Sequence, residues 1–311
     1  MMGSLADRIY RAQCIGNVEP IEYMVPYPST QSLLEGQNIK FSDQVIYKKD
    51  NITNLQFYEL VQQTAHWLNG LGIKPRERVI IQQLGTPQTE ILLFGIWHLG
   101  AIGVIVENQS MVPIDDLKDL AKKIPAEIDL INKIEPYPIF FDPKYKSLLS
   151  DEALVFISKD KSIRLSHYNL LVNTNSIQKA LDLRIRTKLF CDIEPTSTAW
   201  VVFKAILPIY AGCLYTRSDP EIVFSFHDVN KNNGFQLRND WENLGKFDDH
   251  HFGVCPENTA AFCIGNTPVH LTHYEKDGSA LKIQGHSVMM GYLNDQANEI
   301  GFRDNALYLM S

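Results

Sequence analysis

Hydrophobic residues recur at helical spacing in two segments of the first hundred residues, 53–71 and 88–99. Thr53 or Asn54 is a suitable N-cap for the first segment, and Gly100 is a suitable stop for the second. Short apolar runs at 78–82 and 101–106 follow the two segments and predict buried strands. This alternation of amphipathic helix and short strand is typical of an α/β fold.

The second half of the chain continues this alternation and then changes. Residues 166–181 predict a helix capped by Ser166, and the apolar segment 200–210 predicts another. Residues 269–274 and 280–284 alternate around the turn 276–279, which predicts a β-hairpin. The remaining expectations are a short amphipathic helix at 115–123, strands at 153–157 and 213–215, and a polar stretch at 230–249 with a turn at 232–234.

Composition places the chain among ordinary globular proteins, with 45% hydrophobic and 21% charged residues in 311. The net charge of −7 argues against general binding of nucleic acid or anionic membranes, which requires a surplus of lysine and arginine. The longest apolar stretch, 91–106, is shorter than the roughly 20 residues of a membrane helix. The five cysteines have no CxxC spacing, and we expect a reduced, cytoplasmic protein.

Four motifs occur in order along most of the chain. They lie at 51–60 with 72–79 (NITNLQFYEL, GIKPRERV), at 97–104 (WHLGAIGV), at 164–170 with 206–212 (RLSHYNL, ILPIYAG), and at 281–294 (LKIQGHSVMMGYLN). In order and spacing these motifs resemble the large domain of adenylate-forming enzymes, which include acyl-CoA synthetases, AMP-dependent ligases and luciferase-like ligases. The resemblance implies stacked α/β lobes with mixed and parallel sheets and a small β-rich C-terminal part.

The resemblance also implies a division of the chain. We expect a first α/β lobe at 1–149, a second at 150–229, and a β-rich remnant at 230–311. In the family, a run similar to 302–311 continues into Thr-Gly-Asp, whose aspartate holds the ribose of ATP, and Met310 and Ser311 occupy the first two of these places. In the family a C-terminal domain closes over the site and supplies a catalytic lysine, and we expect this protein to lack that domain.

The nucleotide motifs of the family are degenerate here. Its phosphate loop reads S-G-T-T-G-x-P-K-G, whereas the corresponding stretch, 157–163 (ISKDKSI), has no glycine and contains Asp160. In the family's aromatic-Gly-x-Thr-Glu turn, Cys255 and Pro256 stand at the threonine and glutamate places, and Glu257 follows one residue late. A vestigial nucleotide site would therefore consist of Ser158, Lys159, Lys161 and Glu257. The alternative is that these lysines and this carboxylate are ordinary solvated loop side chains.

Other constellations have simpler interpretations. The cluster His250, His251, Cys255, Cys263, His270 and His273 does not have the spacing of a closed zinc site. Ser166 and His167 are neighbours at a helix start, so their side chains diverge, and capping explains the serine. We expect no catalytic residue and no metal ligand.

We therefore expect a pseudoenzyme that retains an adenylate-forming fold without ATP or Mg²⁺ and acts as a structural or adaptor subunit among other protein subunits. The alternative is an acyl-activating ligase, or an acyl- or nucleotide-binding protein, completed by a partner in trans, which would use ATP and Mg²⁺. A further alternative is that the chain is a fragment of a longer enzyme.

Overall fold

The computed structural model describes residues 4–108, 121–125 and 128–310, and every structural statement below concerns these residues. A π-helical stretch, Trp200–Ile206, runs directly into α8, and Trp241–Lys246 and Pro256–Asn258 form 3₁₀ turns. The α-helices are α1 (Leu5–Ala12), α2 (Thr30–Phe41), α3 (Asn54–Gly70), α4 (Gln88–His98), α6 (Leu130–Ile134), α7 (His167–Ala180), α8 (Leu207–Tyr210) and α9 (Asp295–Gly301).

The strands form three sheets. The first has the order β17 (Gly291–Tyr292), β7 (Ser162–Ser166), β6 (Glu152–Ile157), β4 (Ile102–Val106), β3 (Arg78–Ile80) and β5 (Lys122–Lys123). The second has the order β14 (Thr267–Pro268), β13 (Ala261–Ile264), β12 (His251–Val254), β11 (Gly234–Arg238), β10 (Ile222–Ser225), β8 (Lys188–Asp192), β9 (Leu214–Tyr215), β1 (Val45–Tyr47) and β2 (Ile52–Thr53). The third is β15 (Thr272–Asp277), β16 (Ala280–Gly285), β19 (Ala306–Met310) and β18 (Phe302–Arg303).

Parallel pairing dominates the first two sheets, and antiparallel pairing makes up the third. Strands β6, β4, β3 and β5 are parallel neighbours, as are β12, β11, β10, β8, β9 and β1. The third sheet contains the expected hairpin, with Thr272 opposite Gly285. The mixed α/β architecture with a small β-rich C-terminal part is therefore confirmed.

The sheets combine strands from distant parts of the chain. Strands β1 and β2 belong to the first expected segment, yet they extend the second sheet beyond β9. Strand β17, from the third segment, pairs with β7 in the first sheet. The division into 1–149, 150–229 and 230–311 stays a prediction.

Helices α3 and α4 confirm the expected pair. The Thr53 hydroxyl accepts a hydrogen bond from the Gln56 amide at 3.2 Å, and the Gln56 side chain accepts one from the Thr53 amide at 2.9 Å, which completes a capping box. The two helices pack closely where Gly95 of α4 faces Thr64 of α3, since a Cβ atom at Gly95 would lie 2.4 Å from Thr64 Cγ2. No described helix is both long enough and apolar enough to cross a membrane.

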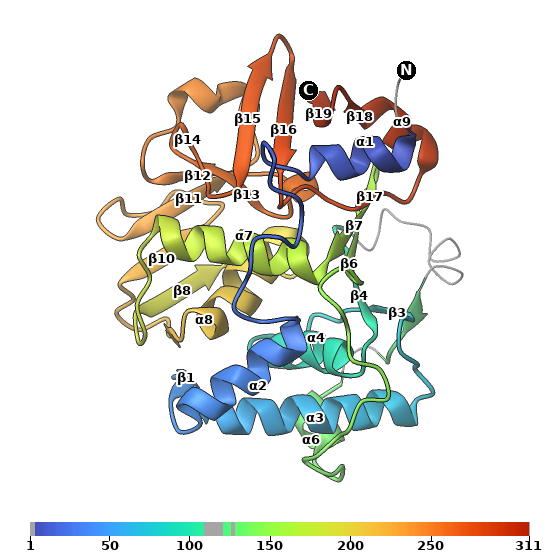
Figure 1. Cartoon of the computed structure of the whole chain (residues 1–311). Coiled ribbons are helices and arrows are strands. Elements are labelled where there is room, and N and C mark those ends of the chain that lie inside the picture. The colour runs from blue at the N-terminus through green and yellow to red at the C-terminus, as the bar shows by residue number, and fades with distance from the viewer. Residues whose placement is uncertain (1–3, 109–120, 126–127, 311) are drawn as a thin grey trace.

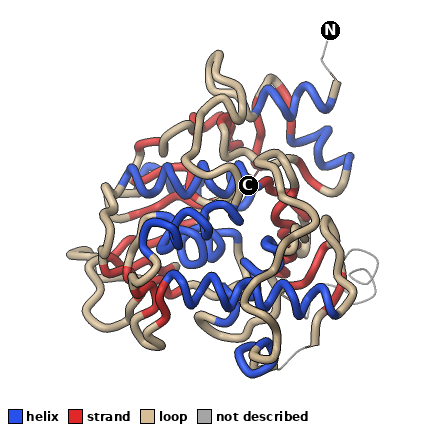
Figure 2. Tube along the Cα trace, turned by 60° about the horizontal axis from the view of Figure 1, so that its bottom comes forward, coloured by secondary structure: helices blue, strands red, loops and turns tan. Residues whose placement is uncertain are grey.

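Helix α7 lies across the middle of the molecule, and strands flank the central helices on both sides (Figures 1 and 2). Ser166 caps it by accepting a hydrogen bond from the Asn169 amide at 3.0 Å, as the sequence predicts. Residues 167–177 of the helix are buried, including the polar ones. Asn169 Nδ2 donates to the carbonyls of His286 at 2.9 Å and Val288 at 3.0 Å, and Asn173 Nδ2 donates to that of Ala261 at 2.8 Å. These amides connect α7 to the C-terminal third of the chain.

The structure differs from three local expectations. Strand β11 lies within the polar segment 230–249, where only a turn was expected, because β10 and β12 flank it on both sides. Of the helix expected at 115–123, residues 115–120 lie outside the described residues, and Lys122–Lys123 form a strand paired with β3. The helix expected at 200–210 begins with a π-helical stretch.

Candidate functional site

The turn between β6 and β7 is short and bonded to itself. The two strands pair antiparallel up to Ile157 and Ser162, so only residues 158–161 remain for the connection. The Ser158 amide donates to the Lys161 carbonyl at 2.8 Å, and the Lys161 amide donates to Ser158 Oγ at 3.2 Å. The backbone amides of Ser158 and Lys161 are therefore both bonded within the turn, and neither is free to bind a phosphate.

Lys161 forms an ion pair with Glu257, which lies on the 3₁₀ turn after β12. Lys161 Nζ donates to Glu257 Oε1 at 2.7 Å, across 96 residues of sequence. The Glu257 side chain is 5% exposed and that of Lys161 is 45% exposed, so the contact has one buried and one partly solvated member. A buried carboxylate stays ionised at low cost only when it has a partner of this kind.

Two neighbours of Glu257, Cys255 and Tyr292, are neutral groups. Burial raises the pKa of Cys255 well above its usual value, and the Glu257 charge adds to the shift, so this cysteine remains a neutral thiol. Burial is also the main cause of the raised pKa of Tyr292, followed by the charge of Glu257, and the phenol hydrogen-bonds to that carboxylate. The only cation beside Glu257 in the described chain is thus Lys161.

The structure brings together three of the four residues singled out from the sequence. Ser158, Lys161 and Glu257 are linked by the turn and the ion pair, whereas Lys159 is exposed on the same turn without a described contact. Asp160 is exposed beside it. The interpretation of Lys159 as an ordinary solvated side chain agrees with this position.

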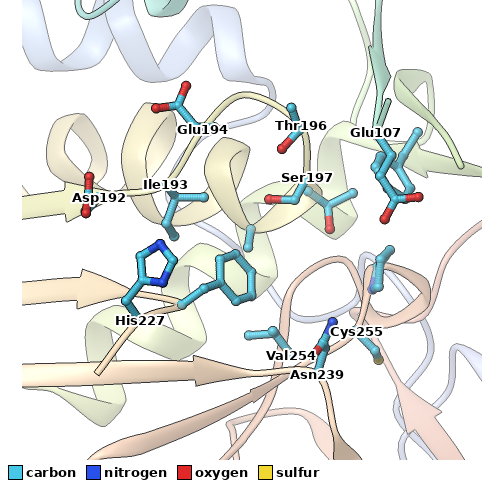
Figure 3. A pocket seen from close by; sticks show the side chains of 15 residues that line it. Glu107, Asp192, Ile193, Glu194, Thr196, Ser197, His227, Asn239, Val254 and Cys255 are labelled. Atoms are coloured by element: carbon cyan, nitrogen blue, oxygen red, sulfur yellow. The ribbon is translucent and has the colours of Figure 1, made fainter. Parts of the chain in front are cut away.

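A cavity of about 350 Å³ opens at the carboxyl ends of the parallel strands (Figure 3). Glu107 follows β4, Asp192 ends β8, His227 follows β10 and Asn239 follows β11. Ser197, on the loop before the π-helical stretch, and His227 and Asn239 border this space from different sides (Figure 3). The carboxyl ends of parallel strands are where α/β proteins bind ligands.

The described lining of this cavity is acidic. It includes the carboxylates Glu107, Asp192 and Glu194, and none of its described members is a lysine or arginine. Sequence reasoning missed Glu107 and Asp192. Glu107 directly follows the strand expected at 101–106, and this position was a usable signal, since polar residues there meet at one edge of a parallel sheet. No strand was expected at 188–192, so no such signal was present for Asp192.

The remaining sequence candidates have structural roles. His167 Nδ1 lies 2.9 Å from Thr30 Oγ1 in the core, and burial lowers the pKa of His167 to about 4. His251 Nδ1 accepts from the Asp248 amide at 3.0 Å, and the His270 ring packs against Tyr23. In the part of the chain that the structure describes, no three His, Cys, Asp or Glu side chains group in a way that could hold a metal ion.

A family model described as AMP-binding enzyme matches residues 35–126. No curated protein sequence matches the chain. The sequence match therefore covers less than half of the protein, and the rest of the comparison depends on structure.

Solved structures share the fold over most of the chain. The anthranilate CoA ligase AuaEII in complex with anthranoyl-AMP is 16% identical with a TM-score of 0.72, covering 92% of this chain and 74% of that one. The N-terminal subdomain of Klebsiella oxytoca NpsA in complex with anthranilyl-AMSN is 16% identical with a TM-score of 0.72, covering 93% and 96%. An o-succinylbenzoate CoA synthetase from Bacillus subtilis is 9% identical with a TM-score of 0.71, covering 89% and 74%. Identities this low establish a common fold and no more.

Proposed function

We propose that this chain, which has the fold of the N-terminal large domain of the adenylate-forming superfamily, is a non-catalytic protein that serves as a structural or adaptor subunit in a multiprotein complex. The observation that supports this most directly is the ion pair between Lys161 and Glu257. By the family resemblance, Glu257 is the nearest match to the carboxylate that would hold Mg²⁺.

The donor set does not fit Mg²⁺. Glu257 is the one carboxylate at this turn, and its Oε1 already accepts a hydrogen bond from Lys161. Mg²⁺ requires near-octahedral oxygen ligands, and binding here would displace the ammonium group from a buried carboxylate. We therefore assign no metal-dependent step to this site.

The phosphates of a nucleotide also lack partners. The amides of Ser158 and Lys161 are bonded within the turn at 158–161, and the pairing of Ile157 with Ser162 leaves no room for a longer glycine-rich loop. The neighbouring cavity has three carboxylates in its described lining, which would repel a polyphosphate. These features support loss of nucleotide chemistry while the fold remains intact.

The test is carboxylate-dependent pyrophosphate exchange with ATP, Mg²⁺ and a panel of carboxylic acids, with AuaEII assayed in parallel as a positive control. Calorimetry with Mg·ATP on Lys161→Ala and Lys159→Ala provides a matched pair, because both lysines lie on the same turn and only Lys161 contacts Glu257. We expect no exchange and no difference between the two variants in ATP binding. Exchange activity, or an ATP affinity lost in Lys161→Ala alone, would overturn the proposal.

The subunit role has a separate test. Affinity purification of the tagged chain from its native cells is expected to recover a stoichiometric protein partner. We also propose a reducing, cytoplasmic setting, which is supported by five buried cysteines without disulfides. Recovery of the chain alone, as a monomer, would contradict the adaptor role without restoring catalysis.

The cavity at the strand ends favours a second candidate function, an acyl-activating ligase or an acyl- or nucleotide-binding protein completed by a partner in trans. Its volume of about 350 Å³ lies within the range of small-molecule sites. Under this alternative, anthranilate or another small carboxylic acid binds to the chain, and Asn239→Ala weakens the binding. Activity that appears only when a lid-bearing partner is added would favour this candidate.

A further inference from the structure

A second cavity, of about 580 Å³, is lined in part by residues 190–192 of β8. It is bordered by the turn after β1, by the residues after β9, and by Thr86 before α4. Asp192 is the only lining residue that it shares with the first cavity. The two cavities are therefore separate sites that meet at the end of β8.

The charge of this second cavity is opposite to that of the first. Its cationic lining residues are Lys48, Lys49, Lys204 and Arg217, against the carboxylates Asp50 and Asp192. Lys204 Nζ donates one hydrogen bond, to the Ile193 carbonyl at 3.1 Å, which leaves two of its three N–H groups for a ligand. A surplus of cations around a concave surface favours an anionic ligand.

A buried donor without a partner points to the same kind of ligand. Tyr47 lines the cavity and is 2% exposed, yet its hydroxyl has no hydrogen-bond partner among the described residues. An unpaired hydroxyl in such a place is costly, and a ligand acceptor would satisfy it. The Tyr215 hydroxyl, by contrast, already donates to the Cys191 carbonyl at 3.0 Å.

Aromatic rings form the apolar part of the lining. The Tyr47 and Tyr215 rings lie 5.5 Å apart, and the Phe190 and Tyr215 rings lie 6.0 Å apart. Arg217 lies over the Phe190 ring, with 5.7 Å between the guanidinium carbon and the ring centroid. A ligand with a flat or apolar body fits beside these rings.

We propose that this cavity binds a small organic anion, a carboxylate or a phosphate monoester, with its charged group on Lys204, Arg217 and the Tyr47 hydroxyl and its apolar body against the aromatic rings. Neither the family resemblance nor the first cavity assigns this site. Its occupation does not depend on whether the chain activates carboxylates.

Calorimetry on the whole chain at constant ionic strength tests the proposal with four probes: benzoate, phenyl phosphate, inorganic phosphate and neutral benzamide. We expect saturable one-to-one binding of benzoate or phenyl phosphate. The probe that binds more tightly shows whether the site prefers a carboxylate or a phosphate monoester. Benzamide and inorganic phosphate are expected to bind about tenfold more weakly or not at all, since each lacks either the charge or the apolar body.

Variants locate the ligand. Arg217→Gln and Tyr47→Phe are expected to weaken binding of the better probe about tenfold and about threefold, respectively, on the usual strengths of charge-assisted and neutral hydrogen bonds. Arg184→Gln, the same charge change on an arginine whose side chain is 82% exposed elsewhere, is the matched control. Circular dichroism confirms that each variant is folded. The proposal is overturned if neither organic anion saturates, if the two arginine variants weaken binding equally, or if Asn239→Ala in the first cavity weakens it and Arg217→Gln does not.

Discussion

Glu90→Gln tests whether a carboxylate in the core makes stability depend on pH. Glu90 lies in the first turn of α4 and is fully buried. Its Oε1 accepts a hydrogen bond from Thr86 Oγ1 at 3.2 Å, and its Oε2 has no partner among the described residues. Burial raises the pKa of Glu90 to about 7, although the nearby Lys204 charge favours the ionised form.

The direction in which pH changes the free energy of unfolding follows from the pKa values of Glu90 in the unfolded and folded states. The carboxyl has an ordinary pKa of 4.5 in the unfolded chain and about 7 in the fold, so the folded state binds the additional proton between these values. The free energy of unfolding that depends on Glu90 is therefore greatest below pH 4.5 and is lost as pH rises to about 7. At about 1.4 kcal/mol per pKa unit, the loss amounts to about 3 kcal/mol.

The glutamine variant removes this titration while it retains the shape of the side chain. We expect the stability of Glu90→Gln relative to wild type to rise by about 3 kcal/mol between pH 4.5 and pH 8. Urea unfolding followed by tryptophan fluorescence at several pH values measures this difference. The variant must be compared with wild type at each pH because other groups titrate in the same range. Burial lowers the pKa values of His98 and His167 to about 4, so both histidines destabilise the fold as pH falls below 6.5.

Asp43→Asn, the same chemical change on an exposed side chain, is the control. The reasoning is refuted if the stability difference between wild type and Glu90→Gln is constant across this range. A difference that instead falls as pH rises toward 4.5, and is constant above that value, would mean that Glu90 is ionised and stabilised by Lys204, with the opposite sign of linkage.

Three further substitutions have defined outcomes in urea unfolding at neutral pH. Lys161→Met is expected to lower the free energy of unfolding by about 1–3 kcal/mol because the buried Glu257 carboxylate loses its cation. A double-mutant cycle with Glu257→Gln should show coupling between the two residues, and additive effects would contradict the ion pair. Gly95→Ala is expected to destabilise by about 1–3 kcal/mol, against the usual gain from alanine in a helix, because the new methyl group meets Thr64; a stabilised variant would disprove this close contact. Ser166→Ala is expected to cost about 1 kcal/mol through loss of the N-cap of α7, whereas an unchanged midpoint would show that the cap contributes little.

The helices could be predicted from the sequence because their signals are local. Thr53 and Ser166 mark helix starts by residue type and by the side chain three positions later, and the structure confirms both caps. Strand β11 could not be predicted in this way. Its residues are partly polar, and its conformation depends on hydrogen bonds to β10 and β12 on either side, which no local pattern reports.

In the candidate site, too, local features could be predicted from the sequence and long-range contacts could not. The shortness of the stretch after Ile157 is visible in the sequence, and in the structure only residues 158–161 connect β6 to β7. The contact between Lys161 and Glu257 spans 96 residues and depends on how the first sheet meets the turn after β12, so the sequence supplies the two residues and not their pairing. The second cavity likewise requires Tyr47, Lys204 and Arg217 from three separate elements.

The buried side-chain amides of Asn169 and Asn173 in α7 depend on acceptors that are synthesised much later than the helix itself. Asn173 and Asn169 lie 88 and 119 residues before the carbonyls of Ala261 and Val288 to which they donate. While the ribosome is still translating this interval, the central helix has been made but Asn169 and Asn173 do not yet have these acceptors. Folding of the N-terminal part before the rest, which is usual for multidomain chains, would leave this helix half-solvated. These hydrogen bonds of Asn169 and Asn173 can therefore form only after residue 288 has been synthesised, so the native packing of α7 requires the C-terminal third of the chain.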